Sequence, residues 1–452
     1  MRSVPRSYRR DHEGDESMGS GRRRLAIALL AALGIAGAAC GNEGDDDDAS
    51  GDSSESTTAE GSEDANQFAD LERVAEPDPC EADPGVSDTE IKVGTIAIES
   101  GPSALSFAPA LEGIRARIEK ANQEGELGNR TITLVTRDDT GDQTRNGEVA
   151  RDLVEQEQVF GIIETTNTSN GSAEYLNEQG VPVAGWHVGV PAWAMYPNMF
   201  TFRQGTADEP ENEYTTRNAE LLADQGATAV ALIGGGNQSS ALFIDRVKRS
   251  IEQAGDIEVV YENVSVPPAQ TDFTADVQAI KDSGADALVT GMDLLQNAAI
   301  SDALSKAGVT MKVIVFPGGY DPRVVSLPGM EGALFGLEFY PFELNQPAFT
   351  EFDKWAPDST VRGQVPFIGW LSAEMFIQGL EEAGLNCPTR EAFIANLRLL
   401  DDYDGAGAFD PVDLSEDFGD EFRCVYYVKV ENGAFVPQYD GEAFCGDPIS
   451  FE

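Results

Sequence analysis

Hydrophobic and polar positions alternate along residues 88–316 in two repeating patterns, one typical of strands and the other of helices. Residues 90–97 alternate as a strand does, whereas residues 106–122 place apolar side chains at helical spacing. Residues 159–164 form a continuous apolar run, as a strand covered on both faces requires. Further strands are predicted over residues 131–136, 181–185, 229–233, 258–261, 287–290 and 312–316. Further helices are predicted over residues 145–158, 172–179, 211–225, 240–254, 274–283 and 298–307.

Strands that alternate with helices in this way indicate the α/β class. The βαβ units that result are right-handed and build parallel sheets with helices packed on their faces. The alternation runs twice along the chain, with a break near residues 203–207, so we predict two Rossmann-like lobes. A long helix is expected afterwards over residues 365–383, before a cysteine-containing C-terminal end.

The N-terminal residues predict an export signal. Three consecutive arginines precede a short apolar stretch over residues 25–39. This stretch is shorter than the roughly 20 residues that a membrane-spanning helix needs. Cys40 follows Gly37-Ala38-Ala39 and resembles the lipobox cysteine of bacterial lipoproteins, whose thiol is acylated. We therefore predict a lipoprotein signal peptide over residues 1–39 and a protein anchored by lipid to the outer face of the cell membrane. The alternative is an ordinary secretory signal with an incidental cysteine.

Residues 40–87 are rich in Asp, Glu, Ser and Gly and hold few apolar side chains. Such a segment gains too little from burial to offset its ordering entropy, so we predict an acidic disordered tether. The whole chain holds 79 acidic and 31 basic residues, a net charge of −48. This excess argues against a nucleic-acid partner, which needs clustered lysines and arginines, and against electrostatic docking on an anionic membrane.

Four cysteines follow Cys40. Cys80 lies near the end of the predicted tether, and Cys387, Cys424 and Cys445 lie in the C-terminal part of the chain. An even number outside the cell indicates disulfides, and four cysteines allow three connectivities. Cys387 and Cys424 bracket one C-terminal segment, whereas Cys80 and Cys445 stand at the two ends of the folded region. We therefore favour the pairs Cys387–Cys424 and Cys80–Cys445. The spacing of cysteines and histidines indicates no metal site.

Three groups of short motifs occur in order along the first lobe. They are Val93-Gly94-Thr95-Ile96 with Ser100-Gly101-Pro102, Gly113 and Asn122; Gly128-Asn129-Arg130 with Leu134 and Asp138-Asp139; and Gly180-Val181-Pro182-Val183. In this order and spacing, residues 88–435 resemble the leucine/isoleucine/valine-type periplasmic binding proteins. Together with the predicted signal peptide, Cys40 and the tether, the chain resembles the solute-binding lipoproteins of Gram-positive transporters.

The resemblance implies the type I periplasmic binding protein fold, with parallel sheets in two lobes joined by three hinge strands. These strands would cross between the lobes near residues 200–204, 336–340 and 425–430. The first lobe would hold residues 88–203 with 341–424, and the second would hold residues 206–335 with 425–452.

The resemblance also implies a function in binding. A small polar ligand, an amino acid or a related amide or organic acid, would be captured between the lobes and delivered to the permease subunits of an ABC importer. No cofactor is implied, and we expect a monomer. The alternative is a ligand-sensing receptor of the same fold that signals to a partner. We do not expect an enzyme, because residues 40–452 hold one histidine, His187, and no G-x-S-x-G or H-E-x-x-H motif.

Three loops after strands of the first lobe could contact the ligand, since ligands of open α/β sheets lie at the carboxyl ends of strands. Their candidate side chains are Ser103, Thr165, Thr166, Asn167, Trp186 and His187. In the family, a hydroxyl residue of the matching loop holds the α-carboxylate, and the resemblance assigns this role to Thr166. A helix N-cap is the alternative. Trp186 could stack on a ligand or cover a lobe edge, and His187 could contact the ligand or be structural.

The second lobe offers Asn237, Asp293 and Tyr320 after its strands, and Trp370 lies on the predicted long helix. Asn237 belongs to a glycine-rich loop that fits neither G-x-G-x-x-G nor a Lys-ended phosphate loop, so we predict a ligand contact. Asp293 could receive a ligand ammonium or hydroxyl, or it could cap a helix. Tyr320 and Trp370 could line the pocket, and a core position is the alternative for Trp370.

One departure from the family pattern concerns the ligand. Branched-chain amino acid binders place a glutamate near the loop that corresponds to residues 317–321, where it holds the α-ammonium. Glycines occupy the matching positions in this chain, and Asp321 is the nearest acid. This departure argues against an amino acid ligand.

Overall fold

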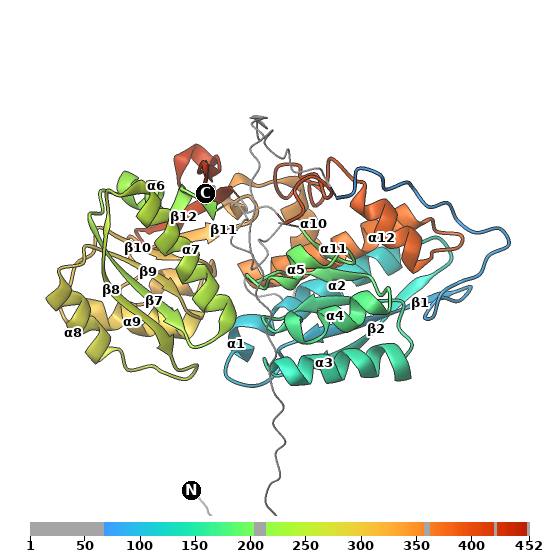
Figure 1. Cartoon of the computed structure of the whole chain (residues 1–452), viewed down its shortest axis with the longest axis horizontal. Helices are drawn as coiled ribbons and strands as arrows, with labels where there is room; N and C mark the ends of the chain where they lie inside the picture. Colours follow the sequence, from blue (N-terminus) through green and yellow to red (C-terminus); the bar gives the residue numbers. More distant parts are fainter. Residues whose placement is uncertain (1–66, 203–213, 357–361, 420–422, 450–452) are drawn as a thin grey trace, which may run out of the picture. The chain divides into compact units, whose positions relative to one another are not determined.

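The computed structural model describes residues 67–202, 214–356, 362–419 and 423–449. These residues form two α/β lobes, as predicted (Figure 1). The predicted signal peptide, Cys40 and residues 40–66 of the predicted tether lie outside the described residues. No helix in the described part of the chain is long and apolar enough to cross a membrane.

The first lobe is built on a five-stranded sheet in the order β2-β1-β3-β4-β5. All neighbouring strands pair in parallel, and Val93 of β1 lies opposite Leu134 of β2 and Gly161 of β3. Every residue of β3 is buried, which explains its continuous apolar pattern. The strands span Glu90–Ala97 (β1), Thr131–Asp138 (β2), Gly161–Thr165 (β3), Val183–Gly185 (β4) and Met199–Thr201 (β5).

Helices from two separate parts of the chain pack on this sheet. The first part contributes α1 (Ala104–Phe107), α2 (Ala110–Glu124), α3 (Gln143–Arg151), α4 (Ala173–Glu178) and α5 (Ala192–Met195). The second part contributes α10 (Pro347–Trp355), α11 (Gln364–Ala383) and α12 (Arg390–Arg398). Helices α2 and α11 approach each other closely at Gly113. A Cβ added at this glycine would lie 1.7 Å from the carbonyl oxygen of Pro366, so no larger residue fits there. The C-terminal part of the chain is therefore integral to the first lobe.

The second lobe holds an eight-stranded sheet in the order β13-β12-β11-β10-β9-β7-β8, with β14 paired to β12. Strands β7 to β11 pair in parallel, but β12 and β13 run antiparallel, which the βαβ pattern did not predict. The strands span Ala229–Gly235 (β7), Glu258–Val266 (β8), Ala287–Gly291 (β9), Val313–Phe316 (β10), Leu334–Leu337 (β11), Cys424–Glu431 (β12), Ala434–Pro437 (β13) and Phe444–Cys445 (β14). A separate two-stranded sheet joins β6 (Tyr214–Thr215) to β15 (Pro448–Ile449).

Four helices cover the sheet of the second lobe, namely α6 (Arg217–Asp224), α7 (Gln238–Ala254), α8 (Thr274–Ser283) and α9 (Leu294–Lys306). Helix α9 begins earlier than the predicted residue 298, because the Asp293 carboxylate accepts a hydrogen bond from the Gln296 N–H at 3.4 Å and caps the helix. Asn237 caps α7 in the same way, accepting from the Ser240 N–H at 2.9 Å.

The passages between the lobes are only partly where the resemblance placed them. The chain leaves β11 after Leu337, and Phe339 then packs on Phe367 of α11, with the ring centroids 4.8 Å apart. Residues 425–430 are not a crossing, because they lie within β12 in the sheet of the second lobe. Residues 203–204 of the first predicted crossing lie outside the described residues.

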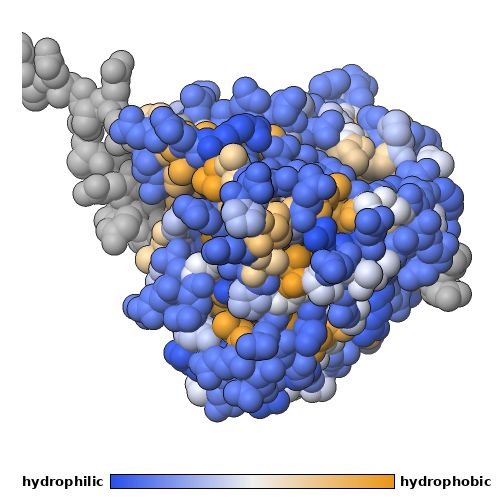
Figure 2. Space-filling model, turned by 90° about the vertical axis from the view of Figure 1, so that its right-hand side faces the viewer, coloured by the Kyte–Doolittle hydropathy of each residue, from blue (hydrophilic) through white to orange (hydrophobic). Residues whose placement is uncertain are grey.

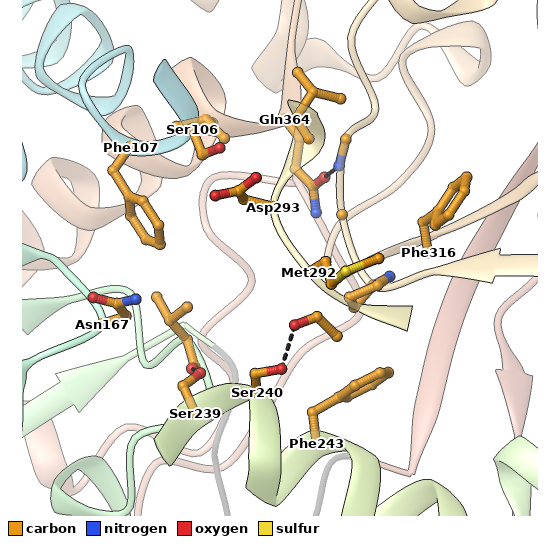
Figure 3. A pocket seen from close by; sticks show the side chains of 18 of the residues that line it. Ser106, Phe107, Asn167, Ser239, Ser240, Phe243, Met292, Asp293, Phe316 and Gln364 are labelled. Atoms are coloured by element: carbon orange, nitrogen blue, oxygen red, sulfur yellow. Dashed lines mark hydrogen bonds between the residues drawn. The ribbon is translucent and has the colours of Figure 1, made fainter. Parts of the chain in front are cut away.

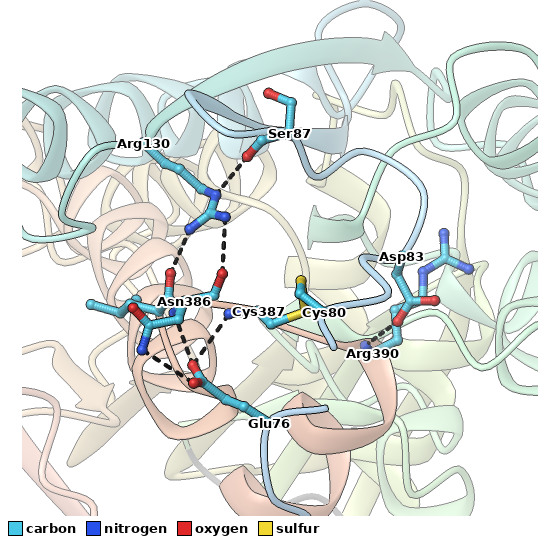
Figure 4. Close-up of a disulfide and its surroundings, with 9 residues drawn as sticks. Glu76, Cys80, Asp83, Ser87, Arg130, Asn386, Cys387 and Arg390 are labelled. Atoms are coloured by element: carbon cyan, nitrogen blue, oxygen red, sulfur yellow. Dashed lines mark hydrogen bonds between the residues drawn. A yellow bond between two sulfur atoms is a disulfide. The ribbon is translucent and has the colours of Figure 1, made fainter. Parts of the chain in front are cut away.

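Both predicted disulfides are wrong, since the structure joins Cys80 to Cys387 and Cys424 to Cys445. Strands β12 and β14 pair antiparallel, which places Cys424 directly opposite Cys445 with the Cα atoms 4.0 Å apart. Residues 67–87 run alongside the region of α12 and bring the Cα atom of Cys80 to 5.6 Å from that of Cys387 (Figure 4). The sequence alone does not decide among the three connectivities that four cysteines allow.

Residues 67–87, predicted as part of the disordered tether, are instead held on the first lobe. The backbone of Val74 exchanges two hydrogen bonds with the Asn396 side chain, at 2.8 and 2.9 Å. The Glu76 carboxylate accepts from the Asn386 N–H at 2.8 Å, and the Asp83 carboxylate accepts from the Arg390 N–H at 2.7 Å (Figure 4). These bonds satisfy polar groups at both ends of α12 and its preceding loop, which composition alone could not reveal.

Figure 2 shows the end of the molecule that the first lobe occupies. Its surface is mostly hydrophilic, with small apolar areas between the polar side chains. Separate small apolar areas are normal on a soluble domain and do not indicate a large interface on this face.

Candidate functional site

A cavity of about 500 Å³ lies between the two lobes and is lined by residues of both (Figure 3). Its walls come from α1, from the loops that follow β3 and β4, and from the loops that follow β7, β9 and β10. These loops stand at the carboxyl ends of parallel strands, where ligands of open α/β sheets bind. The volume falls in the range of small-molecule sites, roughly 300–1,000 Å³.

A second cavity, of about 810 Å³, lies between residues 67–87 and α12. Its lining comes from the first lobe alone and includes Phe68, Arg390 and Arg398. Both arginines already donate to backbone carbonyls, such as Arg390 to Phe160 at 2.8 Å and Arg398 to Leu414 at 2.7 Å. The cavity between the lobes is therefore the better candidate site.

The structure brings most of the predicted site residues to this cavity. Those that line it are Ser103, Asn167, Trp186, His187, Asn237, Asp293 and Tyr320. Thr165, Thr166 and Trp370 do not line it, so these three predictions are wrong. In each case the predicted element is correct and the side chain points elsewhere.

Thr166 faces the interior of the first lobe instead of the ligand cavity. Its hydroxyl oxygen accepts from the Thr168 N–H at 3.3 Å and lies 2.9 Å from the Thr168 hydroxyl oxygen. Because the Thr168 hydroxyl donates to Asp139 at 2.8 Å, the Thr166 hydroxyl must donate to Thr168. Thr165 is the last residue of β3 and is fully buried. Neither hydroxyl is available to a carboxylate in the cavity.

The hydroxyl pair rests on a buried polar cluster beneath the loop that carries Asn167. The Asn146 side-chain amide donates to Glu164 at 2.6 Å and to Asp139 at 3.1 Å. Burial, together with the negative charge of Asp139, raises the pKa of the Glu164 carboxyl to about 7. The cluster therefore holds one carboxyl that takes up a proton near neutral pH, directly behind the wall of the cavity.

Trp370 belongs to the core between α11, α10 and α2. It is 3% exposed, and its ring centroid lies 5.7 Å from that of Phe352 in α10. The Arg117 guanidinium of α2 stands 5.8 Å from the Trp370 ring. These contacts use the ring for helix packing and confirm the core alternative.

His187 is fixed by two partners. The Gly189 N–H donates to its Nδ1 at 3.0 Å, so Nδ1 carries no proton and Nε2 does. Nε2 then donates to the Glu338 carboxylate at 3.1 Å. Since Glu338 follows β11 at a passage between the lobes, His187 joins the loop after β4 to that passage. The structural role therefore accounts for both ring nitrogens.

The lobes touch beside the cavity. The Asn170 side-chain amide of the first lobe donates to the Gln238 side-chain carbonyl of the second at 3.0 Å. The Ser239 hydroxyl at the start of α7 donates to the backbone carbonyl of Val188. Both contacts join a ligand-side loop of the first lobe to the N-terminus of α7, so a shift of one lobe would move a wall of the cavity.

Many lining residues were not predicted, and a large share of them is apolar. The apolar ones include Leu294. They also include Phe107, Phe243, Met292 and Phe316, which are labelled in Figure 3. Met292 and Phe316 directly follow or end strands, so the rule that found Asp293 could have found them too. Phe107 and Phe243 lie on helices, and their place in the cavity depends on how α1 and α7 are turned. The sequence offers no signal for that rotation.

Gln364 also escaped prediction, although it shapes the cavity wall. Its side-chain carbonyl accepts from the backbone N–H groups of Gly319 at 3.0 Å and Tyr320 at 3.4 Å. Gly319 has a φ of 109°, a conformation that strongly favours glycine. This glycine therefore has a conformational role, and the loop after β10 is held by its backbone.

The charged side chains of the cavity differ in their partners. The Asp321 carboxylate is paired with the Arg323 guanidinium, at 2.5 and 2.9 Å. Asp293 has no such ion pair among the described residues, and its carboxylate receives the Gln296 N–H alone. Burial raises the pKa of the Asp293 carboxyl above its ordinary value. No group of three or more Asp, Glu, His or Cys side chains suited to a metal ion occurs in the described parts of the chain.

Comparison with protein families gives the decisive observation. Residues 90–434 match the family model of the periplasmic binding proteins. The chain belongs to this family. Its members are extracytoplasmic solute-binding proteins, so the chain is a binding protein and not an enzyme, as the sequence predicted.

This periplasmic binding protein resembles individual relatives both in sequence and in structure. The Leu/Ile/Val-binding protein homolog 3 of Brucella melitensis is 27% identical over 260 residues, which cover 54% of this chain and 67% of that protein. A fatty acid ABC transporter substrate-binding protein from Thermomonospora curvata has a TM-score of 0.68 at 19% identity, covering 82% of this chain and 96% of that one. A branched-chain amino acid ABC transporter protein from Thermus thermophilus, with bound valine, also has a TM-score of 0.68, at 16% identity, covering 80% and 98%. The two solved structures confirm the fold.

Proposed function

We propose that this periplasmic binding protein captures a small organic ligand between its lobes and delivers it to an ABC importer. The observation that carries the proposal is the cavity of about 500 Å³ whose walls come from both lobes at the carboxyl ends of their strands. A ligand bound there touches both lobes at once. It would stabilise the arrangement in which the lobes face each other most closely.

Capture of this kind needs only a difference between the ligand affinities of the open and the closed arrangements of the lobes. A ligand that contacts both walls binds more tightly to the closed arrangement than to an open one, and so shifts the population toward it. The bonds from Asn170 to Gln238 and from Ser239 to Val188 would assist closure, because they join the same walls. The permease would then recognise the closed form through surfaces of both lobes.

The ligand class is part of the proposal. An amino acid was the expectation, but the Thr166 hydroxyl that the resemblance assigned to the α-carboxylate is turned away from the cavity. The acid nearest the family's ammonium site, Asp321, is paired with Arg323. The names of relatives, which refer to branched-chain amino acids and to fatty acids, support a ligand with a substantial apolar part. The apolar side chains of the cavity support the same conclusion.

The lipid anchor is also proposed. Cys40 follows a predicted signal peptide, and the described structure begins at residue 67 on the first lobe. Acylation of Cys40 would leave residues 41–66 between the membrane and the point where the chain joins that lobe. Mass spectrometry of the protein from membranes of its own cells tests this, since a lipid-modified N-terminal Cys40 supports the anchor and an unmodified N-terminus refutes it.

The test of capture is a thermal-shift screen of the purified protein against amino acids, amides, organic acids, amines and sugars. A ligand at about 100 times its dissociation constant should add roughly 2.7 kcal/mol to the folded state. In the variant Ser106→Trp, the indole would occupy cavity space beside Phe107, and the shift should disappear. The matched variant Ser305→Trp, on an exposed position of α9, should keep it. A shift that survives Ser106→Trp would place the ligand elsewhere and refute the proposal.

A further inference from the structure

Asp293 is a carboxylate of the cavity wall that has no paired cation among the described residues. Its carboxylate receives one weak hydrogen bond, from the Gln296 N–H at 3.4 Å, and is directed toward the open space near Ser106 (Figure 3). In the described part of the chain, no lysine, arginine or histidine pairs with it. A half-buried carboxylate without a paired cation is costly, and a cationic group on the ligand would reduce that cost.

The other acids of the cavity are already engaged or lie outside its interior. Asp321 is paired with Arg323, and Glu338 accepts from His187 at 3.1 Å. Glu112 is exposed on α2. Asp293 is thus the acid with the clearest capacity to take a positive charge from a ligand.

The resemblance assigned a ligand carboxylate to the Thr166 hydroxyl, but this hydroxyl does not face the cavity. The hydroxyls of Thr166 and Thr168 form a chain that ends on Asp139, inside the first lobe. An amino acid would therefore bring a carboxylate into the cavity with no hydroxyl from these residues to receive it. The arginines that also line the cavity, Arg217, Arg246 and Arg323, each already have a partner.

The aromatic side chains of the wall suit an apolar ligand body. Phe107 packs on Trp186 in the first lobe, with ring centroids 5.5 Å apart. Phe243 and Phe316 stand on the side of the second lobe (Figure 3). Aromatic faces also attract cations, which adds to the effect of Asp293. The net charge of −48 favours the approach of a cation over that of an anion.

We propose that the ligand is an organic amine, cationic at one end and apolar in its body, that pairs its ammonium with Asp293 and carries no α-carboxylate. This inference rests on the proposed capture of a small ligand between the lobes. The inference replaces the amino acids that the names of relatives mention with organic amines, the class of ligand that Asp293 favours.

Three probes with the same phenyl group and similar alkyl chains test the proposal by calorimetric titration of the purified protein. They are 2-phenylethylamine, 3-phenylpropionate and L-phenylalanine. The amine should bind at least about tenfold more tightly than the other two, because it alone offers a cation without a carboxylate. An equal or higher affinity for phenylalanine or phenylpropionate would overturn the proposal.

The variant Asp293→Asn tests whether Asp293 is the residue that pairs with the ligand ammonium. Asparagine caps helices as well as aspartate does, so α9 should fold. The affinity for 2-phenylethylamine should fall roughly 10- to 150-fold, as for loss of a hydrogen bond to a charged group. The matched variant Asp302→Asn removes the same charge from a later position of α9, outside the cavity lining, and should change the affinity little. Equal losses in both variants would refute a specific role of Asp293.

The remaining outcomes separate this inference from the proposed function. If none of the three probes binds but an acid, a zwitterion or a sugar shifts the melting temperature and loses this effect in Ser106→Trp, the amine is refuted and capture stands. If no compound of any class binds the folded protein, capture is refuted and the amine with it.

Discussion

At the scale of single residues, two carboxyls on either side of the same wall have different roles. Asp293 faces the cavity and has no cation beside it among the described residues. Glu164 is fully buried behind the loop of Asn167 and is held by Asn146. Burial raises the pKa of both, but a ligand can reach Asp293 alone. We therefore assign binding to Asp293 and support of the wall to Glu164.

Glu164 should make the stability of the protein depend on pH. Its pKa is raised to about 7 in the folded protein, above the ordinary value of 4.5. Its contribution to stability is therefore complete below about pH 4.5 and is lost as the pH rises through 7. The variant Glu164→Gln stays neutral, so above pH 7 it should be more stable than the natural protein by roughly 1–3 kcal/mol.

Urea unfolding of both proteins at several pH values measures this effect. The difference in the free energy of unfolding should grow between pH 5 and pH 8, and contributions from the other acids cancel in the comparison. The variant Glu155→Gln, at an exposed position of the π-helical segment Asp152–Gln156 that follows α3, is a suitable control and should show little pH-dependent difference. A difference of the same size at pH 5 and pH 8 would contradict the raised pKa of Glu164.

The sequence predicted the position of site residues better than their direction. Asp293, Asn237 and Tyr320 follow strands, and the general rule for open sheets placed them in the cavity correctly. Thr166 obeys the same rule, yet its loop turns the hydroxyl toward Asp139. That direction depends on residues of α3 and of the loop before it, which a reading of the Thr165–Asn170 stretch did not include.

At the scale of elements, local patterns were sufficient wherever burial alone decides the structure. The strand β3 and the helix α11 are examples, since all residues of β3 and most residues of α11 are buried. The antiparallel pairing of β12 with β11 and the Cys80–Cys387 disulfide required pairings between distant segments. No local period contains those pairings, which explains why the cysteines were paired wrongly.

The Cys80–Cys387 disulfide should hold residues 67–87 on the first lobe. In the double variant Cys80→Ser with Cys387→Ser, the hydrogen bonds of Val74, Glu76 and Asp83 would remain but the covalent link would not. We expect limited proteolysis to cut residues 67–87 several-fold faster, because disulfides restrict the less ordered states of a chain. Ligand affinity should not change, since this region does not line the cavity between the lobes.

The second disulfide provides the control for this experiment. The double variant Cys424→Ser with Cys445→Ser removes a link between β12 and β14 in the other lobe. It should leave cleavage within residues 67–87 unchanged. Equal cleavage rates in the natural protein and the Cys80/Cys387 variant would show that the hydrogen bonds hold the segment without the disulfide.

At the scale of the whole folded unit, the cavity exists because the chain assembles each lobe from separate segments. The C-terminal helices α10 to α12 complete the first lobe, and β12 to β14 complete the second (Figure 1). Loops at the carboxyl ends of both sheets then line one space. The family resemblance predicted this interleaving, whereas the alternation of strands and helices predicted only that two lobes exist.

The central claim is that a ligand is held by both lobes at once, and hydrogen–deuterium exchange tests it most directly. The protein would be compared with and without 2-phenylethylamine, or with the compound that gives the largest thermal shift. We predict slower exchange in residues 101–107 and 186–190 of the first lobe and, together with them, in residues 235–243 and 291–296 of the second. Slower exchange in one lobe alone, or along residues 67–87 and α12, would contradict the claim.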